Sequence, residues 1–89
     1  MYNEKEFDFL GITRWHELGY TGKGITICSK EDILKGVFND VICNDPFTTK
    51  SKDAIHGTTV MDYIRQVAPD ATKIATGLNG KVTKRCLVL

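Results

Sequence analysis

The stretch HGTTVMDYIRQVAPDA, residues 56–71, decides how the rest of the sequence is interpreted. It contains apolar residues at the helical spacing of i, i+4 and i+7, with two more beside them: Val60, Ile64 and Val67, then Met61 and Ala68. This spacing predicts a helix with one apolar stripe. Pro69 predicts its end, because a proline disfavours helical geometry in the residue before it. His56 and Gly57 stand where the helix is expected to begin.

Several stretches rich in β-branched residues surround this helix and predict strands. They are ITICS (residues 25–29), VFNDVIC (37–43), TKIAT (72–76) and, as a fourth short strand or a frayed tail, RCLVL (85–89). The order strand, strand, helix, strand favours an α/β fold, with a small parallel-type sheet and a right-handed β-α-β crossover. In the second strand, Asn39 and Asp40 suggest a bulge.

The segment before the first strand predicts a short helix over residues 14–18, which Thr13 could cap. The apolar anchors expected there are Leu10, Trp15 and Leu18. Three glycines within GYTGKG (residues 19–24) predict a turn that leads into the first strand.

Length and composition restrict the classes of protein to consider. A chain of 89 residues with 42% hydrophobic and 26% charged residues predicts one small globular domain over residues 1–89. The net charge of +1 gives no reason to expect nucleic-acid binding. No apolar run approaches the length of a membrane span. The opening MYNEKEFDFL lacks the basic and apolar regions of a signal peptide, so a cytoplasmic location is expected.

The three cysteines are widely spaced, at positions 28, 43 and 86, and form no C-x-x-C pair. Free thiols are therefore expected, with Cys28 and Cys43 acting as small core residues within strands. No metal or cofactor is expected. A zinc site lacks ligands at suitable spacing, and the acidic residues of a calcium site lack a D-x-D-x-D pattern. Those acidic residues are Asp40, Asp45 and Asp53.

Three motifs in order, GYTGKGITIC (19–28), HGTTV (56–60) and APDA (68–71), resemble the N-terminal third of the subtilisin-like serine proteases, peptidase family S8. The resemblance covers about residues 11–76. That family typically has a G-x-T-G-x-G turn, a first core strand that ends at the catalytic aspartate, and an H-G-T-H-V-A segment that opens a helix. An A-P-x-A turn then leads into the next strand.

The resemblance implies roles for individual residues. His56 corresponds to the general base, Gly57 lets the backbone pass close to the substrate cleft, and Thr58 starts the helix. At a helix N-terminus the base is held rigidly, and the helix dipole disfavours its protonated form. The acid has two candidates, Glu31 and Asp32, because SKEDI replaces the family's D-T-G. The alternatives are a histidine that only caps or packs and a solvated charged loop at residues 29–33.

The family's nucleophile is missing from these 89 residues. The only serines are Ser29 and Ser51, and neither lies in a G-T-S-x-A segment. Cys43 is a conceivable substitute, but it falls in a predicted strand, and nothing in the sequence indicates an activated thiol. Removal of the nucleophile alone lowers turnover in subtilisin by a factor on the order of a million. We therefore do not expect the chain to cleave proteins by itself.

Three functions remain open. The first is a truncated subtilisin-like fragment or pseudoenzyme that acts by self-association or partner binding. The second is the N-terminal part of a split protease that needs a separate serine-bearing chain. The third is a small binding module unrelated to proteolysis. A partial sheet leaves an open edge and an uncovered apolar face, so a homodimer burying at least about 1,000 Å² or a complementing chain is expected.

Overall fold

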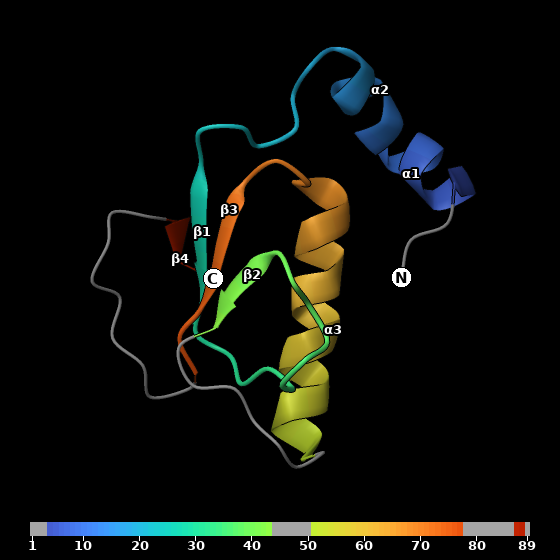
Figure 1. Ribbon diagram of the computed structural model, residues 1–89. Coiled ribbons are helices and arrows are strands. Elements are labelled where there is room, and N and C mark those ends of the chain that lie inside the picture. Colours follow the sequence, from blue (N-terminus) through green and yellow to red (C-terminus); the bar gives the residue numbers. More distant parts are fainter. Residues whose placement is uncertain (1–3, 44–50, 78–86, 89) are drawn as a thin grey trace.

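The computed structural model describes residues 4–43, 51–77 and 87–88 (Figure 1). The elements are α1 (Glu4–Leu10), α2 (Ile12–Glu17), β1 (Thr26–Ser29), β2 (Val41–Cys43), α3 (Lys52–Val67), β3 (Thr72–Ala75) and β4 (Leu87–Val88). The strands form one sheet in the order β2-β3-β1-β4, and each pairing is parallel. The predicted α/β class with a small parallel sheet is confirmed. Because β2 and β3 are parallel neighbours, α3 is the crossover between them.

The helix α3 begins earlier than the sequence suggested. Ser51 is its N-cap, and the Ser51 Oγ accepts a hydrogen bond from the Ala54 backbone N–H at 3.1 Å. Asp53 adds a negative charge in the first turn, where the helix dipole favours one. The prediction that Thr58 starts the helix is therefore wrong. His56 lies in the second turn, where the influence of the dipole has largely decayed.

The buried face of α3 also differs from the predicted stripe. The buried residues are Ala54, Gly57 and Met61, and Ile64 packs against the core beside them. Val67, by contrast, is 42% exposed. Val67 lies about one and two-thirds helical turns beyond Met61, so its side chain points away from the face that carries the buried residues. Ala54 and Gly57 form the part of the buried face that the apolar spacing did not predict, because such small residues contribute little to a hydropathy pattern.

The core lies between α3 and one face of the sheet. Side chains in parallel register share a face, so Val41, Lys73 and Ile27 point to one side and Ile42, Ile74 and Cys28 to the other. The cluster of buried residues on the α3 side is formed by Ile33, Met61 and Ala75, with Val41 and Cys43 packed against it. Figure 1 shows α3 running along this side of the sheet.

A buried lysine closes the turn between α3 and β3. Lys73 is only 2% exposed, and its Nζ donates hydrogen bonds to the carbonyl oxygens of Pro69, at 3.0 Å, and Ala71, at 2.8 Å. The APDA turn is thus fixed by a side chain from the strand that follows it. These two acceptors compensate for the removal of the ammonium group from water.

The second strand is shorter than predicted, because residues 37–40 form a bend and not a strand or a bulge. Arg65 on α3 holds this bend. Its Nε donates to both carboxylate oxygens of Asp40, at 2.8 and 3.0 Å, and its guanidinium lies 4.8 Å from the centre of the Phe38 ring. Asp40 is therefore an ion-pair partner of Arg65.

The N-terminal segment forms two short helices instead of one. The helix predicted over residues 14–18 is α2, and its N-cap is Gly11, with φ of 76°, instead of Thr13. The additional helix α1 precedes it. The Nε2 of His16 donates to the Val67 carbonyl oxygen at 2.8 Å and joins α2 to the end of α3. No residue of α2 is buried, and Trp15 is 56% exposed, so the expected apolar anchors do not enter the core.

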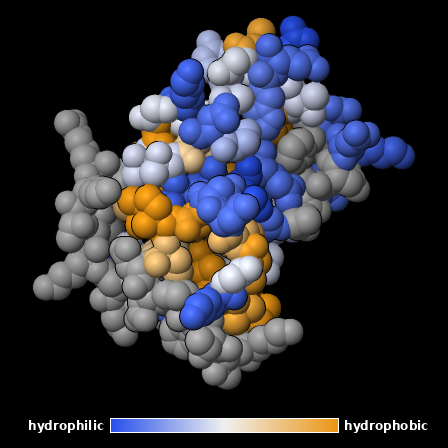
Figure 2. Space-filling view, in the orientation of Figure 1, coloured by the Kyte–Doolittle hydropathy of each residue, from blue (hydrophilic) through white to orange (hydrophobic). Residues whose placement is uncertain are grey.

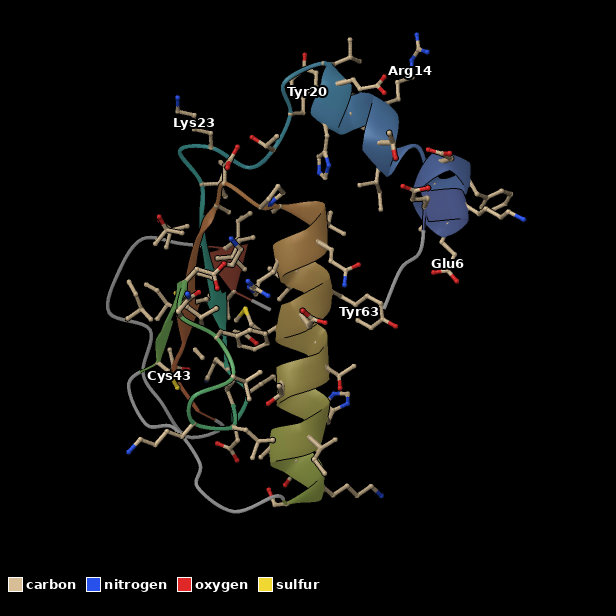
Figure 3. The ribbon with its side chains drawn as sticks, turned by 45° about the vertical axis from the view of Figure 1, so that its right-hand side comes forward. Glu6, Arg14, Tyr20, Lys23, Cys43 and Tyr63 are labelled. Carbon is tan, nitrogen blue, oxygen red and sulfur yellow. The ribbon has the colours of Figure 1, made fainter. Side chains whose placement is uncertain are left out.

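The cysteines differ from one another in chemical state. Cys28 is disulfide-bonded, so the expectation of a free thiol is wrong there, whereas Cys43 does not take part in a disulfide. Cys86 lies outside the described residues. The wide spacing of the cysteines along the sequence gave no sign of this disulfide. Figure 3 shows Cys43 on the sheet, while Tyr63 projects from the outer side of α3.

Candidate functional site

Glu31 and His56 meet where β1 ends. β1 finishes at Ser29, and the chain turns so that Glu31 faces the second turn of α3. The His56 Nε2 lies 3.7 Å from the Glu31 Oε1. The His56 side chain is 65% exposed and that of Glu31 is 26% exposed. This distance is within the range of an ion pair, but it is longer than a hydrogen bond.

The orientation of the ring differs from that of a catalytic triad. In a Ser-His-Asp triad the carboxylate holds Nδ1, and Nε2 faces the nucleophile. Here the atom that lies near Glu31 is Nε2. The nitrogen that faces the carboxylate here is therefore the one that faces the serine in a triad. In this arrangement Glu31 does not hold the ring as a triad carboxylate does.

Gly57 makes the close approach of α3 to this turn possible. A Cβ at Gly57 would collide with the backbone oxygen of Asp32 and would lie 2.9 Å from the Cβ of Glu31. Only a glycine leaves room for the backbone of the turn at this position. The motif led us to expect that Gly57 makes room for the substrate cleft. In the structure, Gly57 instead makes room for the turn after β1 of the same chain.

Thr58 fastens the same segment with two hydrogen bonds. Its Oγ1 accepts from the Leu34 backbone N–H at 3.0 Å and donates to the Ala54 carbonyl oxygen at 2.7 Å. The segment after β1 is thus held on α3 at two adjacent helix positions, Gly57 and Thr58. Sequence reasoning missed this role. The available signal was a threonine inside a helix, whose hydroxyl often bonds to the carbonyl four residues earlier.

Asp32, the second candidate for the acid, lies inside the fold. It is 7% exposed, and its Oδ1 lies 3.4 Å from the position of a Cβ on Gly77. The structure thus places the two adjacent carboxylates in different surroundings. Glu31 lies beside His56, and Asp32 lies toward the chain that follows β3.

The two serines have structural positions. The Ser29 side chain is 0% exposed, and its Oγ has no hydrogen-bond partner among the described residues. Ser51 caps α3. Cys43 lies on β2, separated from β1 by β3. A nucleophile must lie within hydrogen-bond reach of its base, and no serine or cysteine is hydrogen-bonded to His56 in residues 4–43, 51–77 and 87–88.

The described residues contain neither a metal-binding cluster nor a membrane-spanning helix. No three histidine, cysteine, aspartate or glutamate side chains in the described part of the chain come together as a metal site. Of the acidic loop residues considered for calcium, Asp40 pairs with Arg65, Asp53 lies in the first turn of α3, and Asp45 is outside the described residues. None of the helices in the described ranges is long and apolar enough to cross a membrane.

Comparison with known proteins gives no relative: no protein-family model, curated protein or solved structure matches the chain.

Proposed function

We propose that this chain is a subtilisin-like fragment or pseudoenzyme that does not cleave proteins by itself and acts by associating with another chain. The observation that carries the proposal is the corner formed by Glu31 and His56. It brings together an acid and a histidine at the end of the first strand, as the motifs lead one to expect for this family. However, Nε2 is turned toward the carboxylate, and within the described residues no serine or cysteine is hydrogen-bonded to His56.

Exposed apolar residues support action by association. The two edge strands of the sheet are β2 and β4. They carry half-exposed apolar side chains: Ile42 is 49%, Leu87 60% and Val88 52% exposed. Figure 2 shows apolar side chains gathered over β2 and its surroundings. Parallel sheets are usually covered on both faces, and unpaired edges readily accept another strand. A second copy of the chain is the partner that we propose.

Two measurements on the purified chain test this proposal. Incubation with an unfolded protein substrate and with a fluorophosphonate probe for reactive serines should give neither cleavage nor labelling. Sedimentation at micromolar concentration should give a particle of about twice the chain mass of 10.0 kDa. Cleavage that the probe abolishes and that His56→Ala removes would contradict the first part. A folded monomer across the concentration range would contradict self-association.

A second candidate is the acid- and base-bearing part of a split protease. The observation in its favour is the same 3.7 Å separation, because apo active sites often show longer contacts than the working enzyme. The DNA downstream of the Leu89 codon decides between the candidates. A coding frame with a G-T-S-x-A segment, whose product confers cleavage when it is mixed with this chain, would establish the split protease.

The third candidate, a binding module unrelated to proteolysis, makes its own prediction. In that case Glu31 and His56 have no functional role, and both can be replaced without any effect on association. Dimerisation is therefore compared between the parent chain and a double variant, Glu31→Gln with His56→Ala. Unchanged dimerisation agrees with this third candidate. Weaker dimerisation means that Glu31 and His56 take part in the contact between the two chains.

A further inference from the structure

A hollow of about 330 Å³ lies between α3 and the bend that precedes β2. It is open to solvent, and its volume is at the lower end of the range of small-molecule pockets, about 300 to 1,000 Å³. Figure 1 shows the segment between β1 and β2 lying along α3. The residues that line the hollow are Val37, Phe38, Thr58, Thr59, Asp62 and Arg65. Neither Glu31 nor His56 lines it, so a ligand there is independent of the function proposed above.

The charged side chains of the hollow leave a surplus of negative charge. The Arg65 Nε donates to both carboxylate oxygens of Asp40, at 2.8 and 3.0 Å, whereas its Nη1 reaches the Asp62 Oδ1 only at 3.4 Å. Asp40 therefore neutralises the guanidinium, and the charge of Asp62 remains. No hydrogen bond to the Asp62 Oδ2 occurs among the described residues. The Asp62 side chain is 24% exposed, so a cation can approach it from solvent.

The hydroxyl groups of the hollow offer acceptors and not donors. Thr59 precedes Asp62 by three residues, on the same face of α3. Its Oγ1 donates its proton to the Ile55 carbonyl oxygen at 2.9 Å, so only its lone pairs are available to a ligand. The Thr58 Oγ1 likewise donates its proton to its own helix, at the Ala54 carbonyl oxygen. Acceptors beside an excess carboxylate suit a ligand group that is both a donor and positively charged.

Val37 and Phe38 give the hollow an apolar part. Val37 is 51% exposed, and Phe38 packs against the core cluster with its ring 4.8 Å from the guanidinium carbon of Arg65. Apolar side chains beside a charged group complement a ligand with a short hydrocarbon chain and a charged end. An anion fits less well, because two carboxylates surround the one guanidinium.

We infer that this hollow binds an alkylammonium group, with the ammonium at Asp62 and Thr59 and the hydrocarbon chain against Val37 and Phe38. Such a group occurs in free aliphatic amines and at the end of a lysine side chain. In both sources the ammonium is a compact charge that carries several N–H donors and no acceptor.

Amide chemical shifts of the nitrogen-15-labelled chain measure the binding directly. Titration with n-butylammonium chloride should shift the signals of residues 37–38, 58–59 and 62, with saturation in the millimolar range that a ligand of about five non-hydrogen atoms allows. n-Butanol, which has the same chain without the charge, should bind at least about tenfold more weakly. The methylamide of acetyl-lysine distinguishes the sources. Tighter binding than that of butylammonium indicates a lysine side chain of a protein, and weaker binding indicates a free amine.

Three variants test the assignment of residues. Asp62→Asn should weaken butylammonium binding at least about tenfold, and Thr59→Val, which keeps the shape without the acceptor, should weaken it several-fold. Asp70→Asn, at an exposed acid beyond the end of α3, is the matched control and should bind like the parent chain. If Asp62→Asn fails to fold, Thr59→Val and the comparison with butanol still provide the test.

Three results would each overturn the inference. They are equal affinities for butanol and butylammonium, unchanged affinity in a folded Asp62→Asn variant, and no saturation below about 50 mM butylammonium. Shifts of the same signals by acetate but not by butylammonium would also overturn it and would define an anion site at Arg65 instead.

Discussion

The backbone of Gly57 on α3 lies directly against the carbonyl oxygen of Asp32, with no space for a β-carbon between them. This contact sets the separation between α3 and the turn after β1. The residue that precedes each partner in the sequence is His56 on the helix and Glu31 on the turn. As a result of the contact, the His56 Nε2 and the Glu31 Oε1 lie 3.7 Å apart. The geometry of the candidate site therefore follows from a packing contact beneath it.

Gly57→Ala should destabilise the chain, although alanine favours a helix over glycine. The new methyl group forces α3 away from the turn, and overpacking of this kind costs about 1 to 3 kcal/mol, which exceeds the helix gain of about 1 kcal/mol. Urea denaturation measures the change in free energy of unfolding. Thr59→Ala, at an exposed position of the same helix, is the matched control and should change it by less than about 0.5 kcal/mol.

Met61→Ala should reduce the free energy of unfolding by about 2 to 5 kcal/mol, because the side chain is 0% exposed and its removal leaves a cavity. Ile64→Ala, at a position that only partly enters the core, should cost about 2 kcal/mol. Val67→Ala, with 42% exposure, serves as the control and should cost less than about 1 kcal/mol. Equal losses for Met61 and Val67 would show that the apolar stripe read from the sequence is the buried face after all.

Lys73→Met should lower the free energy of unfolding by about 1 to 3 kcal/mol, since the thioether keeps the length of the side chain but cannot donate to Pro69 and Ala71. Thermal denaturation followed by circular dichroism gives the comparison. The exposed Lys23 offers a control, and Lys23→Met should leave the midpoint nearly unchanged. A stabilised Lys73→Met would mean that desolvation of the ammonium group outweighs its two hydrogen bonds.

His56→Ala and Glu31→Gln should each change the free energy of unfolding by about 1 kcal/mol or less. The His56 side chain is 65% exposed, and exposed ion pairs contribute little to stability. A double-mutant cycle in urea measures the coupling between the two residues, with Lys52→Ala as an exposed control on α3. A coupling well above 1 kcal/mol would show that the pair is a structural element of the fold.

The strands and the main helix were predictable because their signals are local. The β-branched runs gave the positions of β1 and β3 to within one residue at each end, and Pro69 predicted the end of α3. The start of α3 was missed because its first turns carry a serine cap and polar residues instead of an apolar repeat. The end of the chain gave only a weak signal for β4, whose place beside β1 is set by long-range pairing.

The sequence indicated which residues to consider for the candidate site, but not how they are arranged. Motif and spacing selected His56, Glu31 and Asp32 together, and the structure places only Glu31 beside the histidine. No local pattern distinguishes two adjacent acids, because the choice depends on which one the turn directs inward. The disulfide of Cys28 was missed as well, because the spacing of cysteines along the sequence does not reveal which residues the fold brings together.

The position of β1 inside the sheet has a consequence for synthesis on the ribosome. β1 ends at Ser29, but its neighbours are β3, which begins at Thr72, and β4, which begins at Leu87. A chain that emerges from its N-terminus therefore presents Ile27 and Cys28 to the cell before either neighbouring strand has been made. During that interval the first strand is an unpaired apolar segment, the kind that chaperones bind, and the parallel sheet assembles only after β3 and β4 have been made.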